Sequence, residues 1–292
     1  MALNKVNGLI VPLLTPFNED LSIDYFGLKT LTARLMNKGV DNFFVMGPLG
    51  EYEFISGHEW RKIIVNVISE VGPKGNVFVG CFGDSADEII EKVKFAEKYT
   101  PYCVVNIPFG SLTNEIGFID FFDKLFTKTK ANIILYNDPD LFKRNILISG
   151  IDKIAGWEKF VAIFDNSKNM SYFKALSMYN QLIKIFQVNE SLAVESFNHN
   201  SSGNVAGLAN IVPEKFIDLK NNYDLFGYNS LIRQELSLIS LVDALPKNKN
   251  IQSFKKILSL FGIIQQFNSD KLEVLTDNEI LLIENIVKKV FA

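Results

Sequence analysis

Short apolar runs alternate with amphipathic stretches along the chain from Gly8 onward. This alternation is typical of strand–helix units built around a parallel sheet. Most of the runs are apolar at successive positions, as expected for strands that are buried on both faces. Eight strands are predicted, at Gly8–Leu14, Asn42–Met46, Asn76–Cys81, Cys103–Ile107, Asn132–Tyr136, Phe160–Phe164, Ile183–Val188 and Asn204–Ala209.

The stretches between the runs carry signals for the start of a helix. Asp24 is a predicted N-cap. Ser56 with Glu59, and Ser85 with Glu88, have the spacing of a capping box, in which each side chain satisfies a free amide of the first helical turn. Each strand therefore leads into a helix, and about eight such units match the size and order of a (β/α)8 barrel.

A doubly wound open sheet is the main rival to the barrel. That fold usually places a glycine-rich dinucleotide turn after its first strand. Here the first strand is followed by Thr15-Pro16-Phe17, which is not such a turn. The sequence therefore favours an α/β protein with a TIM barrel.

After Tyr223 the pattern changes to amphipathic helices only. Apolar positions recur at helical spacing in three stretches, Leu231–Leu245, Ile251–Phe267 and Glu279–Val290. We predict a barrel over residues 1–223 and a C-terminal helical region over residues 224–292 that packs on it. The apolar faces of this region are compatible either with covering one side of the barrel or with oligomerisation.

The charge balance narrows the class of partner. The chain has 292 residues, with 30 Lys and Arg against 33 Asp and Glu, a net charge of −3 and 48% hydrophobic residues. This is a globular composition without the positive charge that binding to nucleic acid or to an anionic membrane requires. Small molecules or other proteins are the expected partners.

The cysteines and histidines give little support to a disulfide framework or a metal site. Cys81 and Cys103 lack metal-ligand spacing, and we expect both to be small core residues. The isolated His58 and His199 cannot build a zinc site with several histidines. Neither a signal peptide nor a membrane-spanning run is recognisable, so we expect a cytoplasmic protein without cofactor or metal.

In a barrel of this type, reactive groups stand where the strands end and the following loops begin. Four motifs lie in the order and at the strands expected of one family: GLIVPLLTPF at Gly8–Phe17, GxxGE at Gly47–Glu51, LYNDP at Leu135–Pro139 and SGNVAGLANIVPE at Ser202–Glu214. On these motifs the chain resembles the class I aldolases that include dihydrodipicolinate synthase, N-acetylneuraminate lyase and the archaeal 2-keto-3-deoxygluconate aldolases. The last motif favours the keto-deoxy-sugar aldolase branch.

The resemblance implies a reaction in which a lysine at the end of the sixth strand forms a Schiff base with pyruvate. Such a lysine needs an apolar pocket that lowers its pKa, so that the free amine is available. Here the sixth strand reads Phe160–Asp165, and Phe164 occupies the position of that lysine. A phenyl ring has no nucleophile, so we expect the covalent step to be absent and the ring to fill the former pocket.

Other positions that the resemblance assigns to substrate binding also differ. Pro48 and Leu49 stand where the family has two hydroxyl residues that hold the pyruvate carboxylate. Proline also lacks an N–H donor. A tyrosine pair after the fourth strand is replaced by Phe109 and Gly110, and a carboxylate-binding arginine by Leu141. These losses gather at the reacting centre while the motifs of the scaffold persist.

Two side chains could still take part in chemistry. Tyr136 occupies the family's proton-relay position, where it either handles a proton or is a packed aromatic residue. Lys168 follows Phe164 closely and could reach back to the pocket. An exposed lysine with an ordinary pKa of about 10.4 is, however, a poor Schiff-base former.

The charged residues near the strand ends also have two interpretations each. Lys143 and Arg144 could bind a carboxylate or phosphate, or they are solvated surface charges. Asp165 and Glu190 resemble a general acid/base pair, although carboxylates at these positions also cap the following helices.

Two hypotheses follow. In the first, the chain is a non-catalytic pseudoenzyme that binds a small 2-oxo acid, a less polar metabolite or an active paralogue. In the second, it is a lyase acting on a 2-oxo acid through another lysine, or through Tyr136 and carboxylates. In both we expect a homodimer or homotetramer. The predicted binding residues are Gly47, Pro48, Leu49, Gly50, Asp165 and Val205.

Overall fold

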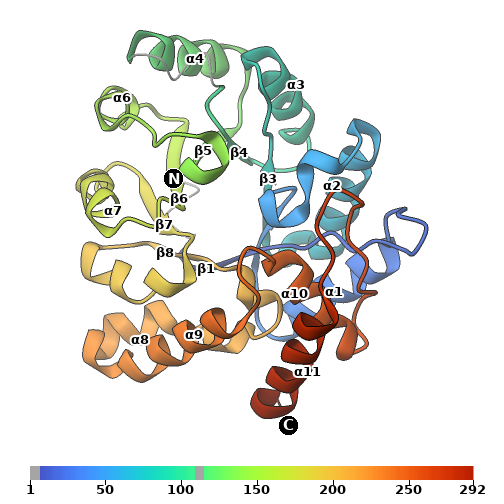
Figure 1. Ribbon diagram of the computed structural model, residues 1–292. Helices are drawn as coiled ribbons and strands as arrows, with labels where there is room; N and C mark the ends of the chain where they lie inside the picture. The colour runs from blue at the N-terminus through green and yellow to red at the C-terminus, as the bar shows by residue number, and fades with distance from the viewer. Residues whose placement is uncertain (1–6, 109–114, 292) are drawn as a thin grey trace.

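The computed structural model describes residues 7–108 and 115–291. Its eight strands are all parallel and pair in sequence order, and β8 pairs with β1 to close the barrel. Figure 1 shows the helices arranged around this barrel. The (β/α)8 fold predicted from the hydrophobic pattern is therefore confirmed, and the open doubly wound sheet is excluded.

The strands coincide with the predicted apolar runs. They are β1 (Gly8–Pro12), β2 (Asn42–Val45), β3 (Asn76–Gly80), β4 (Tyr102–Val105), β5 (Asn132–Asn137), β6 (Phe160–Asp165), β7 (Lys184–Gln187) and β8 (Gly203–Val205). The main difference concerns the last run, because β8 ends at Val205 and a short 3-10 helix, η9 (Gly207–Asn210), follows. Glu190 accepts hydrogen bonds from the amides of Gly207 and Leu208, which turns these residues away from the strand ladder.

The helices begin where the capping signals predict. The side chains of Asp24, Ser56 and Ser85 accept hydrogen bonds from the amides of Gly27, Glu59 and Glu88, respectively. The helices of the barrel are α1 (Tyr25–Asn37), α2 (Gly57–Val71), α3 (Ala86–Ala96), α4 (Glu115–Lys128), α5 (Pro139–Phe142), α6 (Ile148–Ile154), α7 (Met170–Leu176) and α8 (Leu219–Phe226). In the described part of the chain, every helix is too short or too polar to cross a membrane.

Alternation along each strand separates an outer layer from the barrel interior. Outward side chains such as Phe43 and Ile163 pack under the helices, together with both cysteines, which are free and buried as expected. The inward side chains form a second cluster, made of Ile10, Phe44, Phe78, Phe82, Tyr102, Val104, Ile134, Tyr136, Ala162, Phe164, Phe186 and Val205. The interior is thus filled largely by aromatic rings.

Three further helices follow the barrel: α9 (Ile232–Ala244), α10 (Asn250–Leu260) and α11 (Asp277–Phe291). Phe254 and Leu258 of α10 are buried, and Figure 1 shows α10 close to the loops at the carboxyl ends of the strands, whereas α11 extends outward. The predicted division of the chain between residues 223 and 224 lies within α8 and stays a prediction.

Gly80 provides a test of the close packing at the carboxyl end of the barrel. A Cβ atom at this position would lie 2.1 Å from the carbonyl oxygen of Met46, whereas a Cβ at Gly156 meets nothing within 4 Å. We expect Gly80→Ala to lower the free energy of unfolding by about 2–3 kcal/mol through overpacking. Gly156→Ala, the matched control, should change it by less than about 1 kcal/mol. Urea denaturation measures both, and equal effects would contradict the packing described here.

Candidate active site

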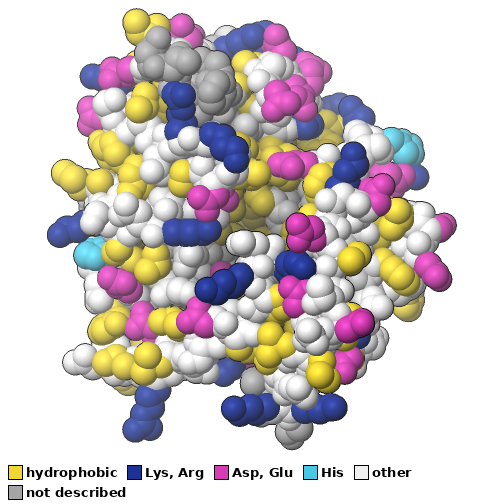
Figure 2. Space-filling model, viewed as in Figure 1, with side chains coloured by type: hydrophobic (Ala, Val, Ile, Leu, Met, Phe, Trp, Pro, Cys, Tyr) yellow, Lys and Arg dark blue, Asp and Glu magenta, His cyan; other side chains and the backbone are white. Residues whose placement is uncertain are grey.

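Aromatic rings fill the interior of the barrel around Phe164. This side chain is 0% exposed, and its ring centroid lies 5.7 Å from that of Phe44, 6.0 Å from Phe78 and 5.4 Å from Phe186. Strands β2, β3, β6 and β7 therefore supply rings to one cluster. In Figure 2 hydrophobic side chains form the floor of a hollow near the middle of the face, and side chains of both charges surround it.

Tyr136 belongs to the same aromatic cluster. Its ring lies 6.0 Å from Phe44, 5.6 Å from Phe82 and 6.5 Å from Phe142, and the residue is only 5% exposed. Burial raises the pKa of its hydroxyl well above the ordinary value, and nearby carboxylates, Asp138 first among them, raise it further. The hydroxyl is therefore held in its neutral form. Its role as a proton relay stays a prediction.

The loop after β2 uses its own amides. Pro48–Gly50 form a short 3-10 helix, η2, in which the Gly50 amide donates to the Gly47 carbonyl at 2.9 Å. The Glu51 amide donates to the Pro48 carbonyl at 3.1 Å. Pro48 has no N–H. Pro48 thus offers no amide to a carboxylate, and the amides of Gly50 and Glu51 are already occupied within the loop. Leu49 instead points toward Gly207.

Asp165 faces away from the barrel axis. It follows the inward Phe164 on β6, and successive side chains of a strand point to opposite faces. Its carboxylate accepts hydrogen bonds from Asn137 Nδ2 at 2.6 Å and from the amide and hydroxyl of Ser167 at 3.2 Å and 2.8 Å. Burial raises the pKa of Asp165 to about 6. Val205, the last predicted binding residue, is buried in the interior cluster.

Asp165 and Glu190 therefore have separate structural partners. Glu190 caps η9 through the amides of Gly207 and Leu208 at 2.8 Å and 3.1 Å. Capping was one of the two interpretations for these carboxylates, although the helix that Glu190 caps follows β8 and not its own strand. Burial raises the pKa of Glu190.

Lys143, Lys168, Lys255 and Arg144 all lie outside the aromatic cluster at the barrel centre. The Lys168 side chain is 55% exposed and pairs with Asp140 at 2.6 Å, and Lys143 donates to the Asp140 carbonyl at 3.0 Å. Arg144 is exposed. Burial lowers the pKa of Lys255 to about 8, but this amine is enclosed in an ion pair with Glu51, outside the interior cluster. Phe109 and Gly110 lie outside the described residues.

The two histidines lie in different elements of the fold. His58 is in α2, and His199 ends the short 3-10 helix η8 (Glu195–His199). Over residues 7–108 and 115–291, no three His, Cys, Asp or Glu side chains are grouped so that they could hold a metal ion.

An open cleft lies beside the barrel axis, between the start of α2, α3 and α5. Its volume is about 680 Å³, and Tyr52 and Phe82 form part of its wall with ring centroids 4.8 Å apart. Phe142 and Leu141 close the side toward α5. A cleft of this size with aromatic walls is typical of sites for small molecules.

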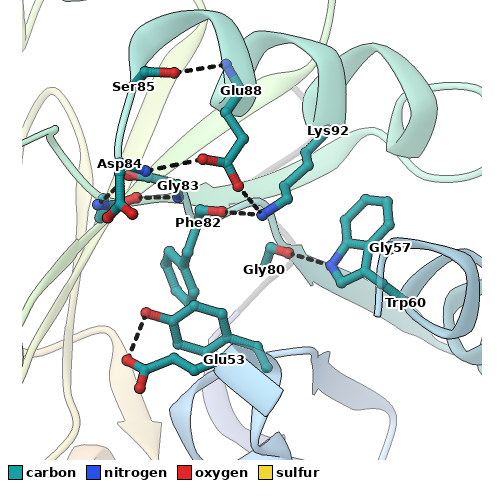
Figure 3. Close-up of polar contacts among 12 residues, drawn as sticks. Glu53, Gly57, Trp60, Gly80, Phe82, Gly83, Asp84, Ser85, Glu88 and Lys92 are labelled. Atoms are coloured by element: carbon teal, nitrogen blue, oxygen red, sulfur yellow. Dashed lines mark hydrogen bonds and ion pairs between the residues drawn. The ribbon is translucent and has the colours of Figure 1, made fainter. Parts of the chain in front are cut away.

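Polar contacts fix one wall of the cleft (Figure 3). Glu88 pairs with Lys92 at 2.7 Å and accepts from the amide of Asp84 at 3.1 Å. Asn106 donates to the carbonyl and accepts from the amide of Gly83, both at 3.0 Å. The wall is therefore pre-formed.

The lining of the cleft carries both charges, since Arg61, Lys92 and Lys143 stand in it beside Glu53, Asp84, Glu88 and Glu91. Carboxylates act on the Tyr52 side of the wall. Burial raises the pKa of Tyr52, and the charges of Glu53, Asp84 and Asp138 raise it further. Sequence reasoning missed this cleft. The capping box at Ser85 and Glu88 locates the start of α3 but does not show that Tyr52, from another loop, lies opposite.

Comparisons with known proteins agree with the fold. Residues 5–285 match the model of the dihydrodipicolinate synthetase family. The chain is similar to the 4-hydroxy-tetrahydrodipicolinate synthase of Methanothermobacter thermautotrophicus, with 24% identity over 266 residues that cover 88% of this chain and 93% of that protein.

Two solved structures show the same architecture. YagE, a prophage protein of E. coli K12 solved in complex with pyruvate, has a TM-score of 0.90 and 18% identity, with 98% of each chain covered. The N-acetylneuraminate lyase of Fusobacterium nucleatum has a TM-score of 0.89 and 19% identity, with 97% of this chain and 98% of that chain covered. At these identities the likeness extends to the fold alone.

Asp165 should make stability depend on pH. Its pKa is about 6 in the folded protein and about 3.9 in the unfolded chain, so the folded state binds the proton more tightly. This contribution to stability is complete below the unfolded pKa and is lost as the pH rises through about 6. We expect the unfolding free energy of the wild type, relative to Asp165→Asn, to fall by about 2–3 kcal/mol between pH 4 and pH 7. Parallel pH profiles in urea denaturation would contradict this assignment.

The exposed Asp243 provides the control. Asp243→Asn should follow the wild-type pH profile, because its side chain is not buried.

Proposed function

The chain belongs to the dihydrodipicolinate synthetase family, and on that basis we propose that it is a non-catalytic member which binds a metabolite beside the barrel axis. It keeps the aldolase scaffold and forms no Schiff base at the barrel centre. The observation that carries the proposal is the burial of Phe164 among Phe44, Phe78 and Phe186. Assembly with a second copy or an active paralogue stays a prediction.

Phe164 supports the absence of covalent chemistry in two ways. Its ring supplies no amine at the position that the family resemblance assigns to the lysine. It also lies 5.4–6.0 Å from three other rings by centroid distance, so those rings occupy the volume in which a substrate carbonyl would approach. A Schiff base needs both an amine and that space.

Recognition of a 2-oxo acid also lacks support at this end of the barrel. Burying a carboxylate requires hydrogen-bond donors or a positive charge. Pro48 has no donor, and the amides of Gly50 and Glu51 bond within their own loop. The charges that act on the Tyr136 hydroxyl come from the carboxylates of Asp138, Glu190 and Asp165. Like charges at this point disfavour an anionic ligand.

The residues that line the cleft beside the axis suit a different class of ligand from a 2-oxo acid. Tyr52, Phe82 and Phe142 offer aromatic surface, and the carboxylates of Glu53 and Asp84 act on Tyr52. The cations of the lining already have partners: Lys92 pairs with Glu88, Lys143 donates to the Asp140 carbonyl, and Arg61 lies over the Phe95 ring. Aromatic faces and carboxylates together attract organic cations. The favoured ligand is therefore a small amine with an apolar or aromatic body.

Trapping with pyruvate tests the loss of covalent chemistry. After incubation with excess pyruvate and sodium borohydride, we expect intact-mass spectrometry to show the unmodified chain. YagE, treated in parallel, is the positive control, since it was solved with pyruvate. A stoichiometric adduct on any lysine would overturn the proposal and support a lyase with a replaced nucleophile. Phe164→Lys alone should also stay unmodified, because Pro48 and Leu49 still provide no hydroxyl donors.

A thermal-shift comparison tests the ligand class. We expect aliphatic and aromatic amines, but not pyruvate or larger 2-oxo acids, to raise the Tm. Saturation at about 100 times Kd corresponds to about 2.7 kcal/mol of stabilisation. Asp84→Asn should weaken the effect, whereas the exposed control Asp243→Asn should leave it unchanged. Stabilisation by 2-oxo acids but not by amines would refute this choice of ligand.

A further inference from the structure

A fully buried ion pair joins the loop after β2 to helix α10. The side chains of Glu51 and Lys255 are both 0% exposed, and Lys255 Nζ donates to Glu51 Oε1. The second oxygen of Glu51 accepts from the Ser269 amide at 2.9 Å, and Lys255 also donates to the Phe267 carbonyl at 3.1 Å. The Phe17 ring centroid lies 4.5 Å from the amine. One pair thus connects the β2 loop, α10 and the segment before α11.

The same loop has an unfavourable backbone at both of its ends. Met46 has a φ of 59° and Glu51 a φ of 57°, and neither is glycine. Side chains other than glycine and asparagine adopt this left-handed conformation at a cost, so it persists only where the surroundings hold it. Lys255 of α10 holds Glu51 in this conformation through its ion pair with the Glu51 carboxylate.

The loop rests on the aromatic cluster, and α10 lies next to the loop. A Cβ atom on Gly47 would lie 2.5 Å from the Phe44 ring, so the loop rests directly on that ring. A Cβ on Gly207 would lie 2.9 Å from Leu49 of the loop and 3.2 Å from Phe254 of α10. Phe44 in turn contacts Phe164, and the position of the loop is therefore linked to the packing at the barrel centre.

We propose that the Glu51–Lys255 pair is a latch that keeps the carboxyl end of the barrel closed, and that detachment of α10 opens it over Phe44. In the closed state the pair holds the left-handed Glu51 and the η2 turn against the ring. When α10 detaches, both charges reach water, the loop relaxes and the aromatic cluster becomes accessible. Separating the charges within the interior would leave each without compensation, so the pair disfavours partly opened arrangements. This inference does not depend on the ligand of the cleft.

Hydrogen exchange on the full chain tests the latch. Lys255→Met removes the cation at similar side-chain length. The reporters are the amides of Leu13, Gly50 and Glu51, which donate to the carbonyls of Phe44, Gly47 and Pro48, respectively. We expect the protection of these amides against exchange to fall at least about tenfold more than that of the amides in β4 to β6. The same variant should increase binding of the uncharged dye Nile red. Lys256→Met is the matched control: this lysine is next on α10 and pairs with the less buried Glu284 at 3.5 Å.

The outcomes separate a latch from a general contribution to stability. Loss of protection spread evenly over all strands, or no local loss, would overturn the proposal. Glu51→Gln keeps the shape of the acidic partner, and we expect it to cause the same local loss of amide protection. It provides the test if Lys255→Met does not fold. Failure of both variants to fold would also refute the latch, since the pair would then be needed for the whole barrel.

Discussion

The contact between the Phe44 and Phe164 rings inside the barrel, 5.7 Å between centroids, determines what the carboxyl end of the fold can hold. A barrel interior is a packed core, and function depends on the space left above it. Here the rings continue the core into that space. The polar groups of the strand ends consequently bond to one another and to the backbone: Asp165 to Asn137 and Ser167, and Glu190 to the start of η9. The concave surface that we propose as the ligand site lies beside the axis, in the cleft lined by residues of α3 and α5.

The hydrophobic pattern was sufficient to predict the barrel because most strands are largely apolar runs and helices α1, α2 and α3 begin with a capping side chain. It was insufficient at the end of β8. The residues Gly207–Ala209 continue the apolar run, but the amides of Gly207 and Leu208 donate to Glu190, which belongs to the loop after β7. No local pattern reveals that a carboxylate from elsewhere in the chain ends this strand. The predicted cores of the other strands did not depend on such a contact.

Features of the candidate site that depend on which residue stands at a position, or on the alternation of side chains along a strand, could be predicted from the sequence. Features that depend on contacts between distant segments could not. Phe164 and Pro48 are informative in the sequence alone, since neither can perform the chemistry that the family resemblance assigns to its position. The outward direction of Asp165 also follows from the inward direction of its neighbour. The cleft could not be anticipated, because Tyr52 and Phe82 come from loops that meet only in the folded barrel.

The Glu51–Lys255 pair raises the question of why a charge pair stands where apolar side chains would pack. Replacing a buried ion pair by apolar residues is often neutral or stabilising, so the pair is weak evidence for stability. Its geometry offers a better reason. An apolar contact is nondirectional, whereas the Glu51 carboxylate has defined partners in Lys255 and the Ser269 amide. A residue in the left-handed conformation is held there only by contacts that do not form in its other conformations. Directional hydrogen bonds meet this requirement better than apolar contacts do. The pair therefore specifies the shape of the loop, and through Gly47 the loop contacts Phe44 of the aromatic interior.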